Sequence, residues 1–119
     1  MTSSELKKHY RLKLDEIRLE KKINELIKKS AQYNRKDYTE QIKQLTKEYY
    51  EKSIRCLEDE IRLYKEIMDI PDSKTRIILK CHFLQAQSFY QIALFIDSTE
   101  MAVKRHCDRY LAKLDKGQI

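Results

Sequence analysis

Residues 88–114 read SFYQIALFIDSTEMAVKRHCDRYLAKL, and this stretch decides the fold. Ser88 is followed three positions later by Gln91, which is the spacing of a capping box at the start of a helix. The apolar residues that follow keep helical spacing as far as Phe95. The pattern therefore predicts a brief helix over residues 89–95.

A second helix follows after a short break in the apolar pattern. Thr99 can cap this helix, which we expect to run to about Asp115. Ala93 and Val103 are ten positions apart, the interval that brings the inner faces of two such helices together across a turn. Two short helices joined by a turn of three or four residues form a helix-turn-helix unit.

The segment after Pro71 supplies a third helix, which supports this unit. Asp72 or Ser73 can cap it, and the apolar pattern continues to about Gln85. The predicted inner side of this helix consists of Ile77, Ile78, Cys81 and Leu84.

The first 70 residues contain neither Gly nor Pro. Their clearest apolar ladder steps alternately by four and three residues, the a/d repeat of a coiled coil: Tyr50, Ile54, Leu57, Ile61, Tyr64 and Met68. A flanking set gives the same helix a second apolar contact face: Tyr38, Ile42, Leu45, Tyr49, Cys56, Leu63 and Ile67. Asp37 and Glu40 have capping-box spacing, so we expect helices over about residues 4–29 and 38–69. Such long helices pair either as an antiparallel hairpin within one chain or as a coiled coil between chains, and both alternatives stay open.

The sequence therefore predicts an all-α protein with two parts. Residues 1–70 form a long two-helix coiled coil or hairpin for packing and oligomerisation, and residues 71–119 form a helix-turn-helix module. A single Gly and a single Pro in 119 residues argue against strand-rich folds, which need frequent turn residues. The net charge of +6 is divided equally between the two parts, so the basic excess is not concentrated in either.

Composition also argues against membrane proteins and exported proteins. The longest apolar run, Ile92–Ile96, is far shorter than the roughly 20 residues that span a bilayer. The first residues lead into a charged helix rather than the apolar core of a signal peptide. Basic and acidic residues are interleaved along the first helix, which argues against a membrane-surface helix. Three cysteines without an export signal indicate reduced thiols in a cytoplasmic protein.

The chemically active side chains do not suggest an enzyme. Cys81–His82 and His106–Cys107 are adjacent pairs on helices, whose side chains point about 100° apart and so rarely bind one metal ion together. The chain lacks a glycine-rich phosphate loop and any strand-end frame for Cys–His–Asp catalysis. We therefore expect no catalytic residue, no metal site, no cofactor and no small-molecule substrate.

The C-terminal part resembles region 4 of bacterial sigma factors, the helix-turn-helix that reads the −35 promoter element. The resemblance covers residues 73–116 and is carried by residues 76–79, 82–84 and 88–93 and by Thr99, Val103, Arg109, Leu111 and Leu114. The whole chain resembles small regulators that join a helical coil to this module, namely the ArpU-type autolysin regulators and the RinA-type late-transcription regulators of Gram-positive phages. Asp97 stands where the family often has Gly, so a positive φ would fall on an aspartate.

The resemblance implies that residues 88–96 form the scaffold helix and residues 99–114 the recognition helix. The base-reading positions then fall on Glu100, Met101, Lys104 and Arg105. The N-terminal end of a helix in the major groove places its first outward side chains at base edges, where Lys104 and Arg105 can donate to guanine. Candidate phosphate contacts are Arg76, Lys80, Tyr90, Gln91, Arg109 and Lys113.

We therefore expect a sequence-specific double-stranded DNA-binding transcriptional regulator. The resemblance alone suggests an origin in a phage or mobile element and RNA polymerase as a further partner. A homodimer through the N-terminal coil would present two recognition helices and raise the affinity for DNA. Two alternatives stay open. The outward residues are an ordinary solvated face with a Glu100–Lys104 pair, or the chain is an adaptor whose coil binds RNA polymerase or a packaging component, with the helix-turn-helix as a docking surface.

Overall fold

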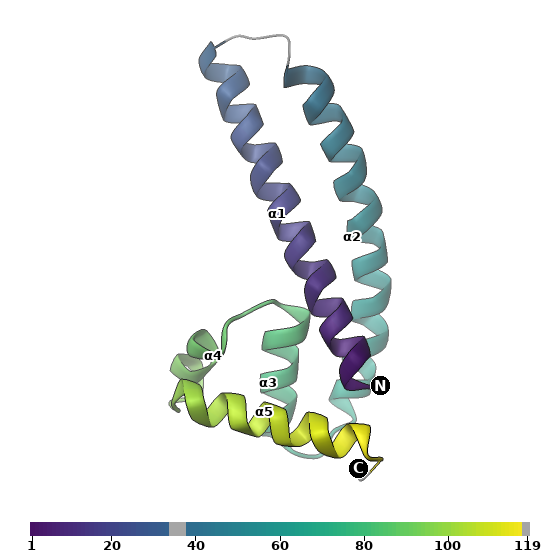
Figure 1. The fold of residues 1–119 in the computed structure, drawn as a ribbon, viewed down its shortest axis with the longest axis vertical. Coiled ribbons are helices and arrows are strands. Elements are labelled where there is room, and N and C mark those ends of the chain that lie inside the picture. Colours follow the sequence, from purple (N-terminus) through teal and green to yellow (C-terminus); the bar gives the residue numbers. More distant parts are fainter. Residues whose placement is uncertain (34–37, 118–119) are drawn as a thin grey trace.

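The computed structural model describes residues 1–33 and 38–117, and every regular element in those ranges is helical (Figure 1). The all-α class is confirmed. Within the same ranges, no helix is long and apolar enough to cross a membrane. In chain order the elements are α1 (Ser3–Tyr33), α2 (Tyr38–Met68), α3 (Ser73–Leu79), the π-helical turn η1 (Lys80–Leu84), α4 (Phe89–Phe95) and α5 (Glu100–Asp115).

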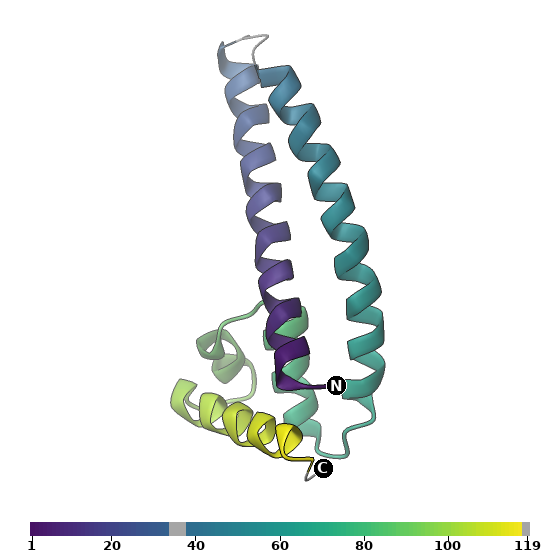
Figure 2. The same ribbon diagram turned by 45° about the vertical axis from the view of Figure 1, so that its right-hand side comes forward.

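The two long helices, α1 and α2, form an antiparallel hairpin and run side by side in both ribbon views (Figures 1 and 2). Each contains 31 residues, and the molecule measures 56 Å along its longest axis. Of the two pairings that the sequence allows, the one within the chain is therefore formed. The predicted cap at Asp37 lies outside the described residues, and α2 begins at Tyr38, as expected.

Two apolar rows run along α2, and one of them faces α1. Cys56, Leu63 and Ile67, from the flanking set, expose at most 1% of their surface. The a/d ladder lies on the outside of the hairpin instead, where each residue is 41–62% exposed. We call this ladder the outer stripe of α2: Tyr50, Ile54, Leu57, Ile61, Tyr64 and Met68. The strongest heptad pattern in the sequence is thus only partly covered in the fold of a single chain.

The three short helices begin at the residues that the sequence predicts. Asp72 caps α3 by accepting a hydrogen bond from the N–H of Thr75 at 3.1 Å. Ser88 and Gln91 form the predicted capping box of α4, and the side chain of Thr99 caps α5. All three predicted starts are confirmed. Each cap is a contact between near neighbours in the sequence, so the local sequence was sufficient to predict it.

The supporting helix differs from the prediction. It is α-helical to Leu79 and continues as the π turn η1, after which the N–H of Gln85 donates to the carbonyl oxygen of Lys80 at 3.2 Å. This helix packs against both the hairpin and α5, so its buried face is broader than the sequence pattern indicates. Ile78 and Leu84 are buried as predicted; as a correction, Ile77 and Cys81 are only half-buried, whereas Leu79 and Phe83 are buried.

One apolar core joins the hairpin to the short helices. Leu6 of α1 and Leu63 of α2 belong to the same buried cluster as Phe83 of η1 and Val103 of α5. The predicted boundary between residues 70 and 71 marks a change in helix length, and the core continues across it. The short helices are therefore fixed to the lower end of the hairpin (Figure 1).

Candidate nucleic-acid interface

Helices α4 and α5 pack against each other as a helix-turn-helix. Ala93 and Val103 are 3% and 0% exposed and belong to the same core cluster. Between the helices, the N–H of Ser98 donates to the carbonyl oxygen of Ala93 at 2.9 Å, and Asp97 has a φ of +53°. The contact across ten residues and the positive φ at Asp97 are both as predicted.

The first turns of α5 direct the predicted base-reading side chains into solvent. Glu100, Met101, Lys104 and Arg105 are all exposed. Arg105 Nη2 lies 3.6 Å from Met101 Sδ, so these two side chains lie together one turn apart. In the described parts of the chain, no carboxylate lies within ion-pair distance of Lys104 or Arg105. The Glu100–Lys104 pair of the alternative interpretation is therefore not formed.

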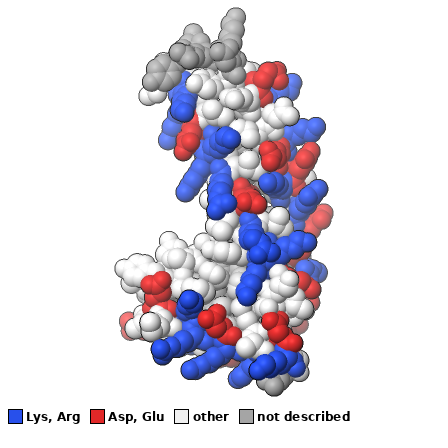
Figure 3. Space-filling view, in the orientation of Figure 1, with Lys and Arg blue, Asp and Glu red and all other residues white. Residues whose placement is uncertain are grey.

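A basic row continues along the length of α5. Arg105, Arg109, Lys113 and Lys116 are exposed and follow one another at intervals of four, four and three residues, which places them on one side of the helix. Figure 3 shows Lys and Arg side chains along the lower edge of the molecule, over α5. Lys116 was not among the predicted contacts, although its spacing from Lys113 was a sufficient signal. Such a row supplies the positive charge that attracts a phosphate backbone.

Two of the predicted phosphate contacts, Arg76 and Lys80, lie apart from this row. Arg76 Nη1 donates to the carbonyl oxygens of Ile70 at 2.6 Å and Pro71 at 2.9 Å, across the turn between α2 and α3. Lys80 Nζ lies 6.0 Å from the ring centre of Tyr64 on α2. These contacts give Arg76 a structural role and place Lys80 beside the hairpin.

The two predicted contacts on α4, Tyr90 and Gln91, are exposed. The side-chain oxygen of Gln91 accepts the N–H of Ser88 at 2.9 Å in the capping box, which leaves the amide nitrogen as the group able to contact a phosphate.

Sequence reasoning missed an apolar patch on α4. Tyr90, Leu94 and Phe95 are 58%, 66% and 73% exposed. The helical period was a sufficient signal for Tyr90 and Leu94, because it places both about 160° around the helix from the buried Ile92. Phe95 comes three positions after Ile92, which is the spacing of one helix face, so the period alone does not indicate its exposure.

Three polar side chains connect the start of α3 to α5. Thr75 Oγ1 donates to the carboxylate of Asp72 and lies 2.8 Å from His106 Nε2. The hydrogen bonds from Thr75 lower the pKa of Asp72. The group borders a hollow of about 520 Å³ whose rim includes Arg109 and Lys113. This network therefore fixes the part of α5 from which two cations of the basic row project.

All three cysteines are free thiols. Burial raises the pKa values of Cys56 and Cys107 to about 12 and also raises that of Cys81. Protonated and largely covered thiols are poor nucleophiles and poor metal ligands. The cysteines therefore act as small apolar side chains in this fold.

Comparison of the chain with protein families, with curated proteins and with solved structures finds no match in any of the three. The likeness to sigma region 4 thus remains a resemblance of sequence pattern.

Proposed function

We propose that this chain is a sequence-specific double-stranded DNA-binding transcriptional regulator that inserts α5 into the major groove. One observation carries the proposal. Val103 is fully buried and fixes the inner side of α5, while the neighbouring Lys104 and Arg105 are exposed and free of carboxylate partners among the described residues. A lysine and an arginine near the start of such a helix are suited to donate to the N7 and O6 acceptors of guanine.

Within this proposal we assign the phosphate contacts from the positions and contacts of the exposed cations. Arg109, Lys113 and Lys116 extend the basic row from the base-reading end of α5 and support backbone contacts. Arg76 and Lys80 are left out, because their contacts lie toward the hairpin. The proposed base contacts are Glu100, Met101, Lys104 and Arg105, and the proposed phosphate contacts are Tyr90, Gln91, Arg109, Lys113 and Lys116.

The proposal includes a cytoplasmic location and a homodimer. Three free thiols are typical of a reducing compartment. A single helix-turn-helix module buries only about 600–1,000 Å² on DNA, so two linked modules raise the affinity. The origin in a phage or mobile element and the contact with RNA polymerase rest on the resemblance to sigma region 4 alone.

Selection of bound fragments from a random duplex library tests the proposal. The wild-type protein is expected to enrich one sequence, with affinity that falls steeply as salt rises because phosphate contacts release counterions. The double variant Lys104→Ala, Arg105→Ala should keep its helical circular dichroism and lose the sequence preference.

A matched control for that variant removes two exposed lysines from α1, Lys28→Ala and Lys29→Ala. This control lowers the net charge by the same amount, so it should retain the preferred sequence. An unchanged preference in the Lys104, Arg105 variant would count against α5 as the reading helix.

A protein-binding adaptor is the second candidate function, and the patch on α4 favours it. A helix that crosses a DNA backbone needs polar contacts to phosphates, whereas the exposed Leu94 and Phe95 are apolar. Contiguous exposed apolar residues commonly mark protein interaction sites. Replacement of Leu94 and Phe95 by serine separates the two functions. Retained DNA affinity with loss of binding to purified RNA polymerase would support the adaptor role of this surface.

A further inference from the structure

The outer stripe of α2 leaves large apolar residues uncovered along about five turns of helix. We propose that a second copy of this chain packs on this stripe through the same stripe of its own, with the two α2 helices antiparallel. The proposed function already includes a homodimer, and the present proposal rests on it. What is added is the face through which the two copies pack and their orientation. The pair forms without DNA.

The exposed area of the outer stripe is sufficient for a stable pair. Its six residues are each 41–62% exposed, and the largest of them are two tyrosines. Side chains of this size offer about 150–250 Å² each, so at these exposures the stripe contributes roughly 470–790 Å² from each copy. The pair would therefore bury roughly 950–1,600 Å², a range that reaches the ~1,000 Å² expected of a specific interface.

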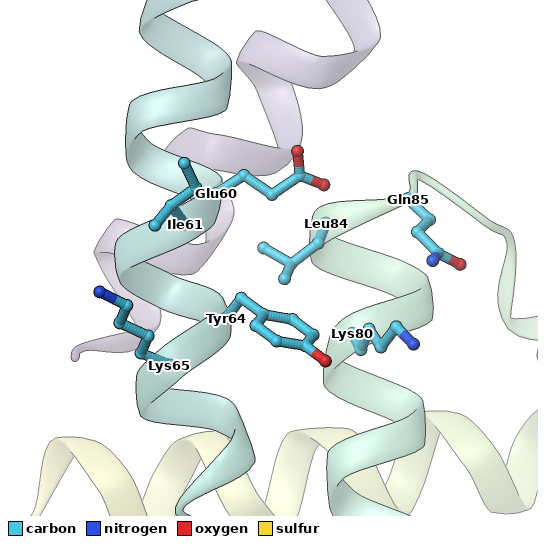
Figure 4. Close-up of a pocket in the computed structure, with 7 residues that line it drawn as sticks. All are labelled: Glu60, Ile61, Tyr64, Lys65, Lys80, Leu84 and Gln85. Carbon is cyan, nitrogen blue, oxygen red and sulfur yellow. The ribbon is translucent and has the colours of Figure 1, made fainter.

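The lower half of the outer stripe opens into an apolar groove of about 350 Å³. Ile61 and Tyr64 of α2 line one side, and Leu84 of η1 lines the other. Figure 4 shows the Tyr64 ring and the Leu84 side chain pointing toward each other across the groove. Lys65, Lys80 and Glu60 also border it. A groove with apolar walls and a rim of two lysines and one glutamate keeps a positive excess, which fits a helix whose apolar row is flanked by acids.

The upper half of the stripe on α2 has this character. Glu51 and Glu58 directly follow the stripe residues Tyr50 and Leu57, are exposed, and lie on the side of the stripe away from α1. When two α2 helices are laid antiparallel about residue 59, the upper half of each stripe meets the lower half of the other. The resulting layers pair Tyr50 with Met68, Ile54 with Tyr64 and Leu57 with Ile61 of the second copy.

Charge supports this orientation at one pair of flanking positions. In the antiparallel pair, Glu51 lies across the interface from Lys65 of the second copy, and both side chains are exposed. In a parallel pair each stripe position would meet its own copy, and Lys47, which continues the heptad before Tyr50, would face another Lys47. The antiparallel pair has two unfavourable contacts, because Glu58 and Glu60 flank the centre at residue 59 and meet the glutamates of the second copy at the twofold axis.

Sedimentation of the full chain without DNA, at tens of micromolar protein, tests the face. The wild-type protein is expected to be a dimer, and Ile61→Glu should raise its dissociation constant at least about tenfold. Ile27→Glu on α1 is the matched control, because Ile27 is 48% and Ile61 50% exposed. Circular dichroism shows whether each variant is folded. A monomeric wild-type protein, or a dimer that withstands Ile61→Glu, would overturn the proposal.

Disulfide trapping tests the orientation in a Cys81→Ser background, in which the remaining Cys56 and Cys107 are each 1% exposed. Tyr50→Cys and Met68→Cys chains are oxidised separately and after mixing. The antiparallel pair predicts a disulfide between residue 50 of one chain and residue 68 of the other, formed in the mixture. Disulfides within each separate sample would show parallel helices and overturn the orientation. Since DNA is absent from both experiments, their failure is distinct from failure of the Lys104, Arg105 test.

Discussion

At the scale of single residues, Asp97 carries an identifiable conformational strain. It adopts a φ of +53° in the turn between α4 and α5 and is exposed. The left-handed region costs an L-residue about 1–2 kcal/mol, less for aspartate than for most, and costs glycine almost nothing. The turn is therefore a position at which the chain can be stabilised without a change in packing.

We predict that Asp97→Gly stabilises the protein by about 0.5–1 kcal/mol, because it relieves this strain. Thermal unfolding followed by circular dichroism should show a midpoint higher by a few degrees. Ser98→Gly is the control, since Ser98 is the next residue and does not have a positive φ. A lower midpoint for Asp97→Gly would contradict the strain argument.

His82 is the residue through which α1, η1 and α4 meet. Its ring stacks between Tyr10 at 4.6 Å and Phe89 at 4.1 Å, measured between ring centres. Its Nδ1 lies 2.8 Å from the carbonyl oxygen of Gln87, which fits an N–H donor. Burial lowers the pKa of His82 below its usual 6.5, and the hydrogen bond to Gln87 opposes this shift in part.

This shift predicts acid sensitivity. When the pH falls below 6.5, the unfolded chain binds a proton at His82 before the folded chain does, so the free energy of unfolding decreases until the pH reaches the folded pKa. Urea denaturation between neutral pH and about pH 5 measures this loss. His82→Phe keeps the ring stack and should flatten the pH dependence. The wild-type protein and the His82→Phe variant both keep His9 and His106. If the free energy of unfolding depends on pH in the same way in the two proteins, His82 is not the source of that dependence.

At the scale of elements, α2 shows what a periodic pattern can and cannot predict. The sequence identifies two apolar faces on this helix, and both exist. It does not indicate which face meets α1, because Leu57 and Leu63 offer the same chemistry to a partner. That choice depends on contacts with residues far away in the sequence.

Replacement of each of these leucines by alanine should therefore give different results. Leu63 is fully buried against the core, so Leu63→Ala is expected to cost about 2–5 kcal/mol. Leu57 is 56% exposed, and Leu57→Ala should cost less than about 0.5 kcal/mol in dilute protein. Urea denaturation at two protein concentrations checks both values. The Leu57 effect should grow with concentration if the outer stripe is a dimer face, and equal losses in dilute protein would contradict the assignment of the two rows.

The short helices were easier to predict than the arrangement of the long ones. Asp72, Ser88 and Thr99 each reach an N–H three residues away, so local sequence suffices to place them. For the candidate site, the same helical period exposes Lys104 and Arg105 once Val103 is turned inward. The helical period does not indicate that Arg76 donates a hydrogen bond to the turn before α3, because that contact depends on where α2 ends.

At the scale of the whole molecule, one core holds the hairpin and the helix-turn-helix together. Leu6, in the first turns of α1, is fully buried with Phe83 and Val103. No periodic signal distinguishes Leu6 from the other leucines of α1, since its burial depends on the short helices packed against it. The two predicted parts therefore share their most buried side chains.

We predict that the two parts unfold together. Leu6→Ala should destabilise the protein by about 2–5 kcal/mol, because it leaves a cavity between them. Hydrogen exchange should then accelerate by the same factor at the amides of Leu63 in α2 and Cys107 in α5. Ile27→Ala, at an exposed position of the same helix, should leave both rates unchanged. Faster exchange at Cys107 with no change at Leu63 would show that α5 opens independently of the hairpin.

The π-helical turn η1 connects the regular part of the supporting helix to the helix-turn-helix. Such a turn holds one residue more than an α-helical turn and takes it up locally, because five residues of π-helix turn through about the same angle as four residues of α-helix. Deletion of a single residue between Lys80 and Leu84 would therefore restore regular winding and leave the direction of α4 and α5 nearly unchanged. A deletion within the α-helical part of α3 would instead rotate all that follows by about 100° around its axis. The supporting helix thus tolerates a change in length at its wide turn far better than anywhere before it.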